Sequence, residues 1–91
     1  MLRITTTFLP DGTQTVPYSS VQLAGSGGLV PYTWSISPNS ASGLPAGMTL
    51  TSGGLISGTP TAGGAGVYDV TIQMTDFAGR SIVREFVFTI N

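Results

Sequence analysis

Glycine and proline recur so often between positions 43 and 60 that no regular helix can run through this part of the chain. The segment reads GLPAGMTLTSGGLISGTP, and its apolar side chains are separated by residues that mark turns. Those apolar side chains can be buried only if very short strands pack on a larger body. We expect strands near 48–51 and 55–58, joined by a tight hairpin at Gly53-Gly54. The pattern predicts an architecture and no ligand.

The rest of the chain also predicts strands. No stretch carries apolar residues at helical spacing without an interrupting glycine or proline, whereas alternation with a period of two recurs in short runs. Turn signals at 9–12 (Leu-Pro-Asp-Gly) and 25–28 (Gly-Ser-Gly-Gly) separate these runs. About seven strands at spacings of roughly ten residues predict an all-β, two-sheet sandwich, with a closed barrel as the alternative. Besides the two strands above, we expect strands over about 4–8, 18–24, 32–37, 68–75 and 80–90.

The last two predicted strands indicate which faces are buried. Over 68–75, large apolar residues alternate with polar ones, so one face belongs to the core and the other to water. Over 80–90, two phenylalanines and an isoleucine share one face. Val83 and Val87 add apolar surface to the opposite face, which we interpret as ordinary sheet propensity. Residues 76–79, with Asp first and Gly fourth, predict a type I turn that joins the two strands.

Most of the eight aromatic residues have inward parity. Trp34 alternates with Tyr32 and Ile36, so we expect its indole at the centre of the core, where a sandwich needs volume. Tyr18 and Tyr68 are interpreted as residues at the edge of the core whose hydroxyls reach a backbone partner or water.

Several motifs carry a family resemblance. They are Leu44-Pro45-x-Gly47-Met48-x-Leu50, Gly54-x-Ile56-x-Gly58-Thr59-Pro60, Tyr68-x-Val70-x-Ile72 and Thr75-Asp76-x-Ala78-Gly79. The chain resembles the putative Ig domain family of bacterial surface proteins, whose relatives are the dystroglycan-type cadherin-like domains, from Ile4 to Ile90. The resemblance implies an immunoglobulin-like or cadherin-like Greek-key sandwich. Such modules usually occur in tandem in large secreted, surface-anchored or phage-borne proteins, as spacers, adhesive modules or appendages of enzymes.

The charged and nucleophilic residues exclude several function classes. Three arginines and four acids give a net charge of −1, which supplies no field to attract nucleic acid. Because the chain has no cysteine, histidine or lysine, it offers no Ser-His-Asp or Cys-His arrangement and no lysine nucleophile. No apolar run is long enough to cross a membrane as a helix. We therefore expect no enzymatic activity, no bound cofactor, no nucleic acid partner and no membrane insertion.

Three residues are candidates for a site. Asp11 and Asp76 are weak candidates for calcium ligands, since cadherin-like relatives bind calcium between domains. Calcium needs six to eight oxygens and typically several carboxylates, so Asp76 is interpreted first as a turn residue that caps its own backbone. Phe77 stands at a hairpin tip, where it either covers its own hairpin or contacts an adjoining domain or partner. The sequence does not decide whether the Phe8 side chain faces the core or the solvent.

The sequence as a whole predicts one domain, 1–91, excised from a larger multidomain chain, with Met1 as an expression start. We expect a non-catalytic structural or adhesion module of a bacterial extracellular, cell-surface or phage protein. The alternatives are a carbohydrate- or protein-binding accessory module of a secreted enzyme, and a calcium-binding cadherin-like domain. The expected partners are neighbouring domains of the same polypeptide, and in the binding alternative a protein or glycan.

Overall fold

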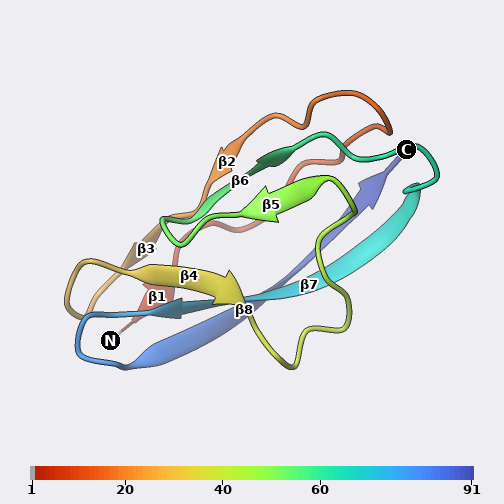
Figure 1. Cartoon of the computed structure of the whole chain (residues 1–91). Helices are drawn as coiled ribbons and strands as arrows, with labels where there is room; N and C mark the ends of the chain where they lie inside the picture. Colours follow the sequence, from red (N-terminus) through yellow and green to blue (C-terminus); the bar gives the residue numbers. More distant parts are fainter. Residues whose placement is uncertain (1) are drawn as a thin grey trace.

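The computed structural model describes residues 2–91, and Met1 lies outside the described residues. This part of the chain contains strands and no helix, which confirms the all-β prediction. The strands, drawn in Figure 1, are β1 (Arg3–Ile4), β2 (Val21–Gln22), β3 (Gly25–Ser26), β4 (Thr33–Ile36), β5 (Met48–Leu50), β6 (Leu55–Gly58), β7 (Gly66–Thr75) and β8 (Ser81–Ile90).

The strands form two layers. One layer is the three-stranded sheet β4-β7-β8. The other contains the sheet β2-β6-β5 and the pair β1-β3. Because β2 and β3 follow each other closely, with β2 pairing with β6 and β3 with β1, they are two parts of one interrupted strand. The predicted two-sheet sandwich is confirmed, with one predicted strand, 18–24, broken and extended to Ser26.

The core lies between the two layers. Trp34 on β4 is buried as predicted, and its ring lies so close to Gly54 that a Cβ there would come within 2.8 Å of the indole. The inward faces of β7 and β8 follow the predicted alternation. Their fully or almost fully buried residues are Val70, Ile72, Met74, Phe86, Phe88 and Ile90.

β7 and β8 form a long antiparallel hairpin of ten residues per strand. The predicted type I turn is present, since the Gly79 N–H donates to the Asp76 carbonyl at 3.1 Å. Gly79 has a φ of 87°, and the Asp76 N–H donates to the Arg80 carbonyl at 2.8 Å. A type I turn followed by a left-handed residue is a common three-residue hairpin loop, and here it needs the glycine.

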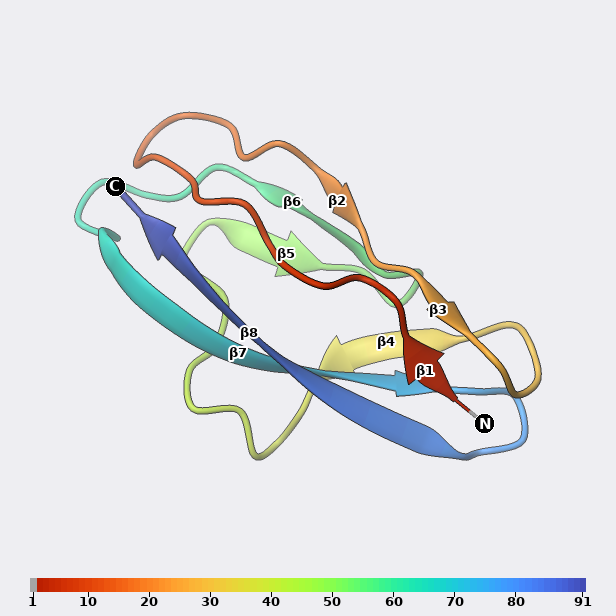
Figure 2. The same ribbon diagram turned by 180° about the vertical axis from the view of Figure 1, so that it is seen from behind.

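The amino-terminal segment crosses from one layer to the other (Figure 2). Its beginning belongs to the layer of β1 and β3, where the Thr5 N–H donates to the Ala24 carbonyl at 2.9 Å. Its end joins the layer of β4, β7 and β8, where the Gly12 N–H donates to the Thr89 carbonyl of β8 at 2.9 Å. The strand predicted over 4–8 is therefore wrong beyond its start, because this backbone must leave one sheet to reach the other.

The turn predicted over 9–12 is also wrong. Gly12 forms a parallel bridge with Ile90, and the chain turns later, where the Val16 N–H donates to the Thr13 carbonyl at 3.2 Å. Within that turn Thr15 has a φ of 64°. A β-branched residue is rare in this region, so no sequence signal indicated the turn.

Serine side chains take the place of a strand beside β7. The sheet pairs β4 with only the last four residues of β7. Farther back, the Thr71 N–H donates to the Ser40 hydroxyl at 2.8 Å, and the Asp69 N–H donates to the Ser42 hydroxyl at 3.1 Å. The connection between β4 and β5 thus satisfies the edge of β7 without a regular ladder.

Candidate interaction surface

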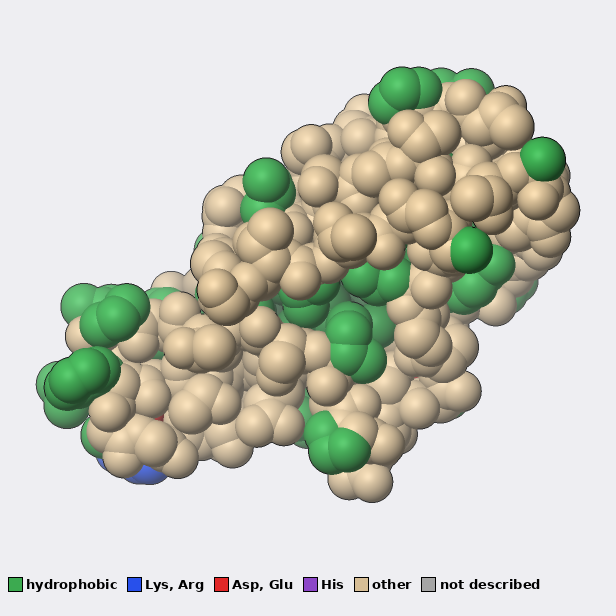
Figure 3. All heavy atoms as spheres, viewed as in Figure 1, with side chains coloured by type: hydrophobic (Ala, Val, Ile, Leu, Met, Phe, Trp, Pro, Cys, Tyr) green, Lys and Arg blue, Asp and Glu red, His purple; other side chains and the backbone are tan. Residues whose placement is uncertain are grey.

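Three exposed apolar residues meet at one end of the sandwich. Val30 and Phe77 are 71% and 74% exposed, and Leu29 is 54% exposed. The Phe77 N–H donates to the Leu29 carbonyl at 2.9 Å, so the β3–β4 loop and the β7–β8 turn lie side by side. Figure 3 shows hydrophobic side chains gathered at the end of the molecule where these two segments meet. We call Leu29, Val30 and Phe77 the end cluster.

Asp76 holds the two segments of the end cluster together. Its Oδ1 accepts a hydrogen bond from the Arg80 N–H at 2.8 Å, which closes the turn. Its Oδ2 accepts one from the Leu29 N–H at 3.2 Å and pairs with Arg80 Nη2 at 3.3 Å. A Cβ at Gly28 would lie 2.5 Å from Oδ2, so this contact also requires a glycine. The interpretation of Asp76 as a turn cap agrees with this geometry, but its link to Leu29 was not predicted.

The environment of Asp76 favours its charged form. Burial of the carboxyl group raises its pKa, but the backbone N–H donors of Arg80 and Leu29 and the Arg80 guanidinium lower it. The net effect is a pKa below the usual 3.8. The carboxylate therefore stays ionised near neutral pH and keeps its three contacts with Arg80 and Leu29.

A second polar cluster lies at the other end of β8. Asp11 Oδ1 accepts a hydrogen bond from the Thr89 N–H at 3.0 Å, and the Tyr18 hydroxyl donates to the Pro10 carbonyl at 2.5 Å. Burial, reinforced by the charge of Asp11, raises the pKa of Tyr18 to about 12. The Tyr18 ring lies 6.1 Å from that of Phe88, as expected for a residue at the edge of the core.

The two candidate calcium ligands are therefore far apart. Asp11 lies beside Thr89 and Asp76 beside Arg80, at opposite ends of a ten-residue strand that spans about 30 Å. They cannot be ligands of one ion. Within residues 2–91, no group of three His, Cys, Asp or Glu side chains lies close enough together to hold a metal.

Asp69 and Glu85 form a separate acidic pair on the outer face of β7 and β8. A side-chain hydrogen bond with Asp69, together with its charge, raises the pKa of Glu85 above 4.5. One oxygen of Asp69, Oδ1, is buried and has no hydrogen-bond partner among residues 2–91. Glu85 therefore binds a proton more readily than a solvated carboxylate would.

Phe8 and Phe77 are the strongly exposed aromatic residues of the described chain. Phe8 is 69% exposed and lies in the segment that crosses between the layers, whereas Phe77 lies in the β7–β8 turn. Carbohydrate-binding platforms use neighbouring, coplanar exposed rings, and these two rings come from different parts of the fold.

Sequence reasoning identified Phe77 but missed its neighbours. Leu29 and Val30 follow a glycine-rich stretch and precede Pro31, so they belong to no periodic pattern. The signal that was available is an apolar pair inside a turn region, where such residues are exposed unless something covers them.

The strand arrangement defines the class of protein. Four strand positions in one layer and three in the other, with a buried tryptophan on β4, characterise a constant-type immunoglobulin sandwich. So does the tyrosine near the start of β7, because the Tyr68 hydroxyl donates back to the Gly64 carbonyl at 2.7 Å. The protein is an immunoglobulin-like β-sandwich.

The family model described as Putative Ig domain matches residues 2–91, and the chain belongs to this family. This match confirms the resemblance found in the motifs and assigns the chain to a family of Ig-like modules that are generally non-catalytic. A comparison with curated proteins finds no match. In the part of the chain that the structure describes, no helix could cross a membrane.

Proposed function

We propose that this chain is a structural module, a spacer or adhesion element, that contacts neighbouring domains of a longer polypeptide through its end cluster. The observation that carries the proposal is the exposure of Leu29, Val30 and Phe77 at one end. Exposed apolar side chains that lie together are typical of surfaces that another protein covers. Hydrogen bonds through Asp76 hold the two segments in place, so little conformational freedom would be lost on contact.

The shape of the sandwich suits an arrangement in series. Its Cα atoms extend over 40 × 21 × 18 Å, and the two ends of the chain lie near opposite ends of the molecule (Figure 1). The β7–β8 turn, which carries Phe77, lies at the same end as the N-terminus (Figure 1), and Leu2 lines a hollow together with Arg80, the residue that follows this turn. A domain joined before Leu2 would therefore meet the end cluster.

The setting that we propose is extracellular, at a bacterial cell surface or on a virion. This setting is supported by the family that the chain resembles, whose modules usually occur in secreted, surface-anchored or phage-borne proteins. Binding of a glycan or protein as an accessory module of a secreted enzyme is the alternative. A glycan array probed with the isolated domain distinguishes the two, because we expect no glycan to be retained.

Replacing Phe77 by serine in the parent polypeptide tests the proposal. We expect the angle to the preceding domain to become broadly distributed, as measured by small-angle X-ray scattering and residual dipolar couplings. Phe8→Ser is the matched control, since Phe8 is similarly exposed but lies outside the end cluster. Unchanged domain orientation in Phe77→Ser, or equal effects of both substitutions, would contradict the proposed role of the end cluster.

A further inference from the structure

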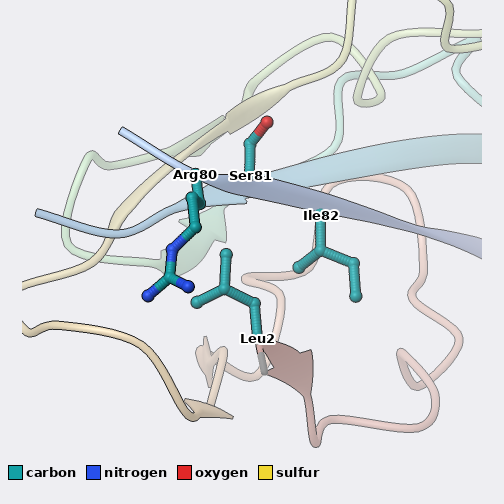
Figure 4. A pocket seen from close by; sticks show the side chains of 4 residues that line it. All are labelled: Leu2, Arg80, Ser81 and Ile82. Carbon is teal, nitrogen blue, oxygen red and sulfur yellow. The ribbon is translucent and has the colours of Figure 1, made fainter. Parts of the chain in front are cut away.

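A groove runs between β1 and the first half of β8. It consists of two adjoining hollows that share Leu2 and Ile82. The side chains of these two residues lie on opposite sides of the first hollow and point toward each other, with Arg80 beside them (Figure 4). Ile4 continues the apolar lining in the second hollow. The groove thus offers an apolar floor along the edge of β8.

The edge of β8 beside this groove has free backbone groups. β8 is the outer strand of its sheet, and Thr89 directs its N–H to Asp11 and its carbonyl to Gly12. Because the direction of these groups alternates along a strand, every second residue before Thr89 faces the same side. These backbone groups have no hydrogen-bond partner among residues 2–91. The residues concerned are Ser81, Val83, Glu85 and Val87.

All three cations of the chain line the groove. Arg3 and Arg84 line the second hollow and Arg80 the first. Arg80 pairs with Asp76, whereas Arg3 and Arg84 have no ion-pair partner among the described residues. No carboxylate is among the lining residues of either hollow. In a chain with a net charge of −1, the groove is a local concentration of positive charge.

The two faces of β8 differ in what they offer to an added strand. Arg84 has the parity of Phe86 and projects on the groove side, where it is exposed. Val83 and Val87 project on the other face and are 52% and 58% exposed. Glu85 also lies on that face. An added strand would therefore bind more tightly with acidic side chains on the groove side, near Arg84. On the other face it would bind more tightly with apolar side chains, because a carboxylate there would be repelled by Glu85.

We propose that the edge of β8 from Ser81 to Val87 binds an extended acidic segment of a partner protein as an added β-strand. The free backbone groups of β8 would form the hydrogen-bond ladder with the added strand. Leu2 and Ile82 would provide the apolar contact. Arg3 and Arg84 would favour acidic residues in the partner. A second copy of this chain would bring the same arginines into the groove, so like charges disfavour self-pairing. The segment 11–14 already occupies the carboxyl-terminal part of this edge, so the added strand would continue along it.

Binding of short synthetic peptides to the whole chain tests the proposal. The probe is a capped eight-residue peptide of alternating valine and glutamate, and its matched control alternates valine and lysine. We expect saturable binding of the glutamate peptide, at least tenfold weaker binding of the lysine peptide, and amide shifts in NMR spectra at Val83 and Val87. N-methylation of the peptide amides along one edge should abolish binding, and methylation along the other edge should not.

Substitutions in the chain distinguish recognition of the peptide's charge from nonspecific binding. Arg84→Gln should weaken binding of the glutamate peptide about threefold, and Arg3→Gln combined with Arg84→Gln about tenfold, with less dependence on salt. Asp11→Asn, at the far end of β8, should leave the affinity unchanged. Phe77→Ser should also have no effect, which keeps this surface distinct from the end cluster.

Three outcomes would overturn the proposal. They are no binding of the glutamate peptide at millimolar concentration, equal binding of the two peptides, and an affinity that the double arginine substitution does not alter. Concentration-dependent dimers in sedimentation experiments, with protection from hydrogen exchange at Val83 and Val87, would assign the edge to a second copy instead.

Discussion

The Tyr68 hydroxyl donates a hydrogen bond of 2.7 Å to the carbonyl of Gly64, four residues earlier. This bond closes the connection between β6 and β7, where the chain crosses from one layer to the other. The Tyr68 ring also lies 6.0 Å from Phe88. One side chain therefore anchors both the crossing and the edge of the core.

Removing only the hydroxyl of Tyr68 measures the contribution of this bond. We expect Tyr68→Phe to lower the free energy of unfolding by about 1 kcal/mol, because the Gly64 carbonyl loses its donor and the ring contacts remain. Tyr32→Phe is the matched control, since the Tyr32 hydroxyl donates to the Gly27 carbonyl at an exposed site. Urea titrations of both variants give the comparison, and equal losses would argue against a special role for Tyr68.

As the pH is lowered from about 7, the free energy of unfolding should first rise and then fall. The pKa of Glu85 is raised above 4.5, so its contribution is largest below that value and declines as the pH rises through the folded-state pKa. The pKa of Asp76 is lowered below 3.8, so its contribution is present above 3.8 and is lost as the pH falls through the folded-state pKa. Denaturant unfolding between pH 2 and 7, roughly the range over which carboxyl groups titrate, should show a maximum near pH 4.

Two substitutions assign the two limbs of that profile. Glu85→Gln should flatten the rise in stability on acidification from neutral pH. Asp76→Asn should flatten the loss below pH 3.8 and lower stability at neutral pH, where the carboxylate holds Arg80 and Leu29. A profile that keeps both limbs in the double variant would show that other groups cause them.

Alanine substitutions at three glycines distinguish the cost of backbone strain from the cost of steric overlap. Gly58 has a φ of 119°, and a Cβ there would lie 2.2 Å from the Gly47 carbonyl oxygen. Gly63 has a φ of 86° with open space around it, and Gly43 has open space and no positive φ. Measured by thermal unfolding, alanine should cost more than about 3 kcal/mol at Gly58, about 1 kcal/mol at Gly63 and less than about 0.5 kcal/mol at Gly43. Any other ranking would contradict this reading of the turns.

Thr15→Asn should stabilise the protein by about 0.5 to 1 kcal/mol. Threonine is strained at the φ of 64° observed here, whereas asparagine tolerates this conformation. Thr13→Asn, in the same exposed turn but without a positive φ, is the control and should change little. A chemical denaturation midpoint that shifts equally in both variants would rule out relief of strain.

Calcium should not raise the melting temperature at millimolar concentration. Asp11 and Asp76 lie at opposite ends of β8, and each already accepts backbone hydrogen bonds. A ligand that binds only the folded state stabilises it in proportion to the logarithm of its concentration. A midpoint that climbs steadily with added calcium, and does not with magnesium, would restore the calcium-binding alternative.

Local alternation and turn chemistry in the sequence were sufficient for the hairpin of β7 and β8, the burial of Trp34 and the short strands β5 and β6. These elements depend on neighbours in the chain, since side-chain parity and glycine positions act over a few residues. The family motifs coincide with these same positions, which is why they indicated the sandwich. Phe77 was identified as a surface residue for the same reason.

Only the tertiary structure decided which distant segments meet. The crossing of the amino-terminal segment between layers, the turn at Thr13–Val16 and the pairing of Leu29 with Phe77 depend on contacts between residues far apart in the sequence. So does the gathering of Arg3, Arg80 and Arg84 along one edge, because position 3 reaches β8 only after the sandwich closes. The sequence by itself determined the architecture, through local periodicity, and the tertiary structure decided the surfaces, because those are assembled from segments that no local pattern connects.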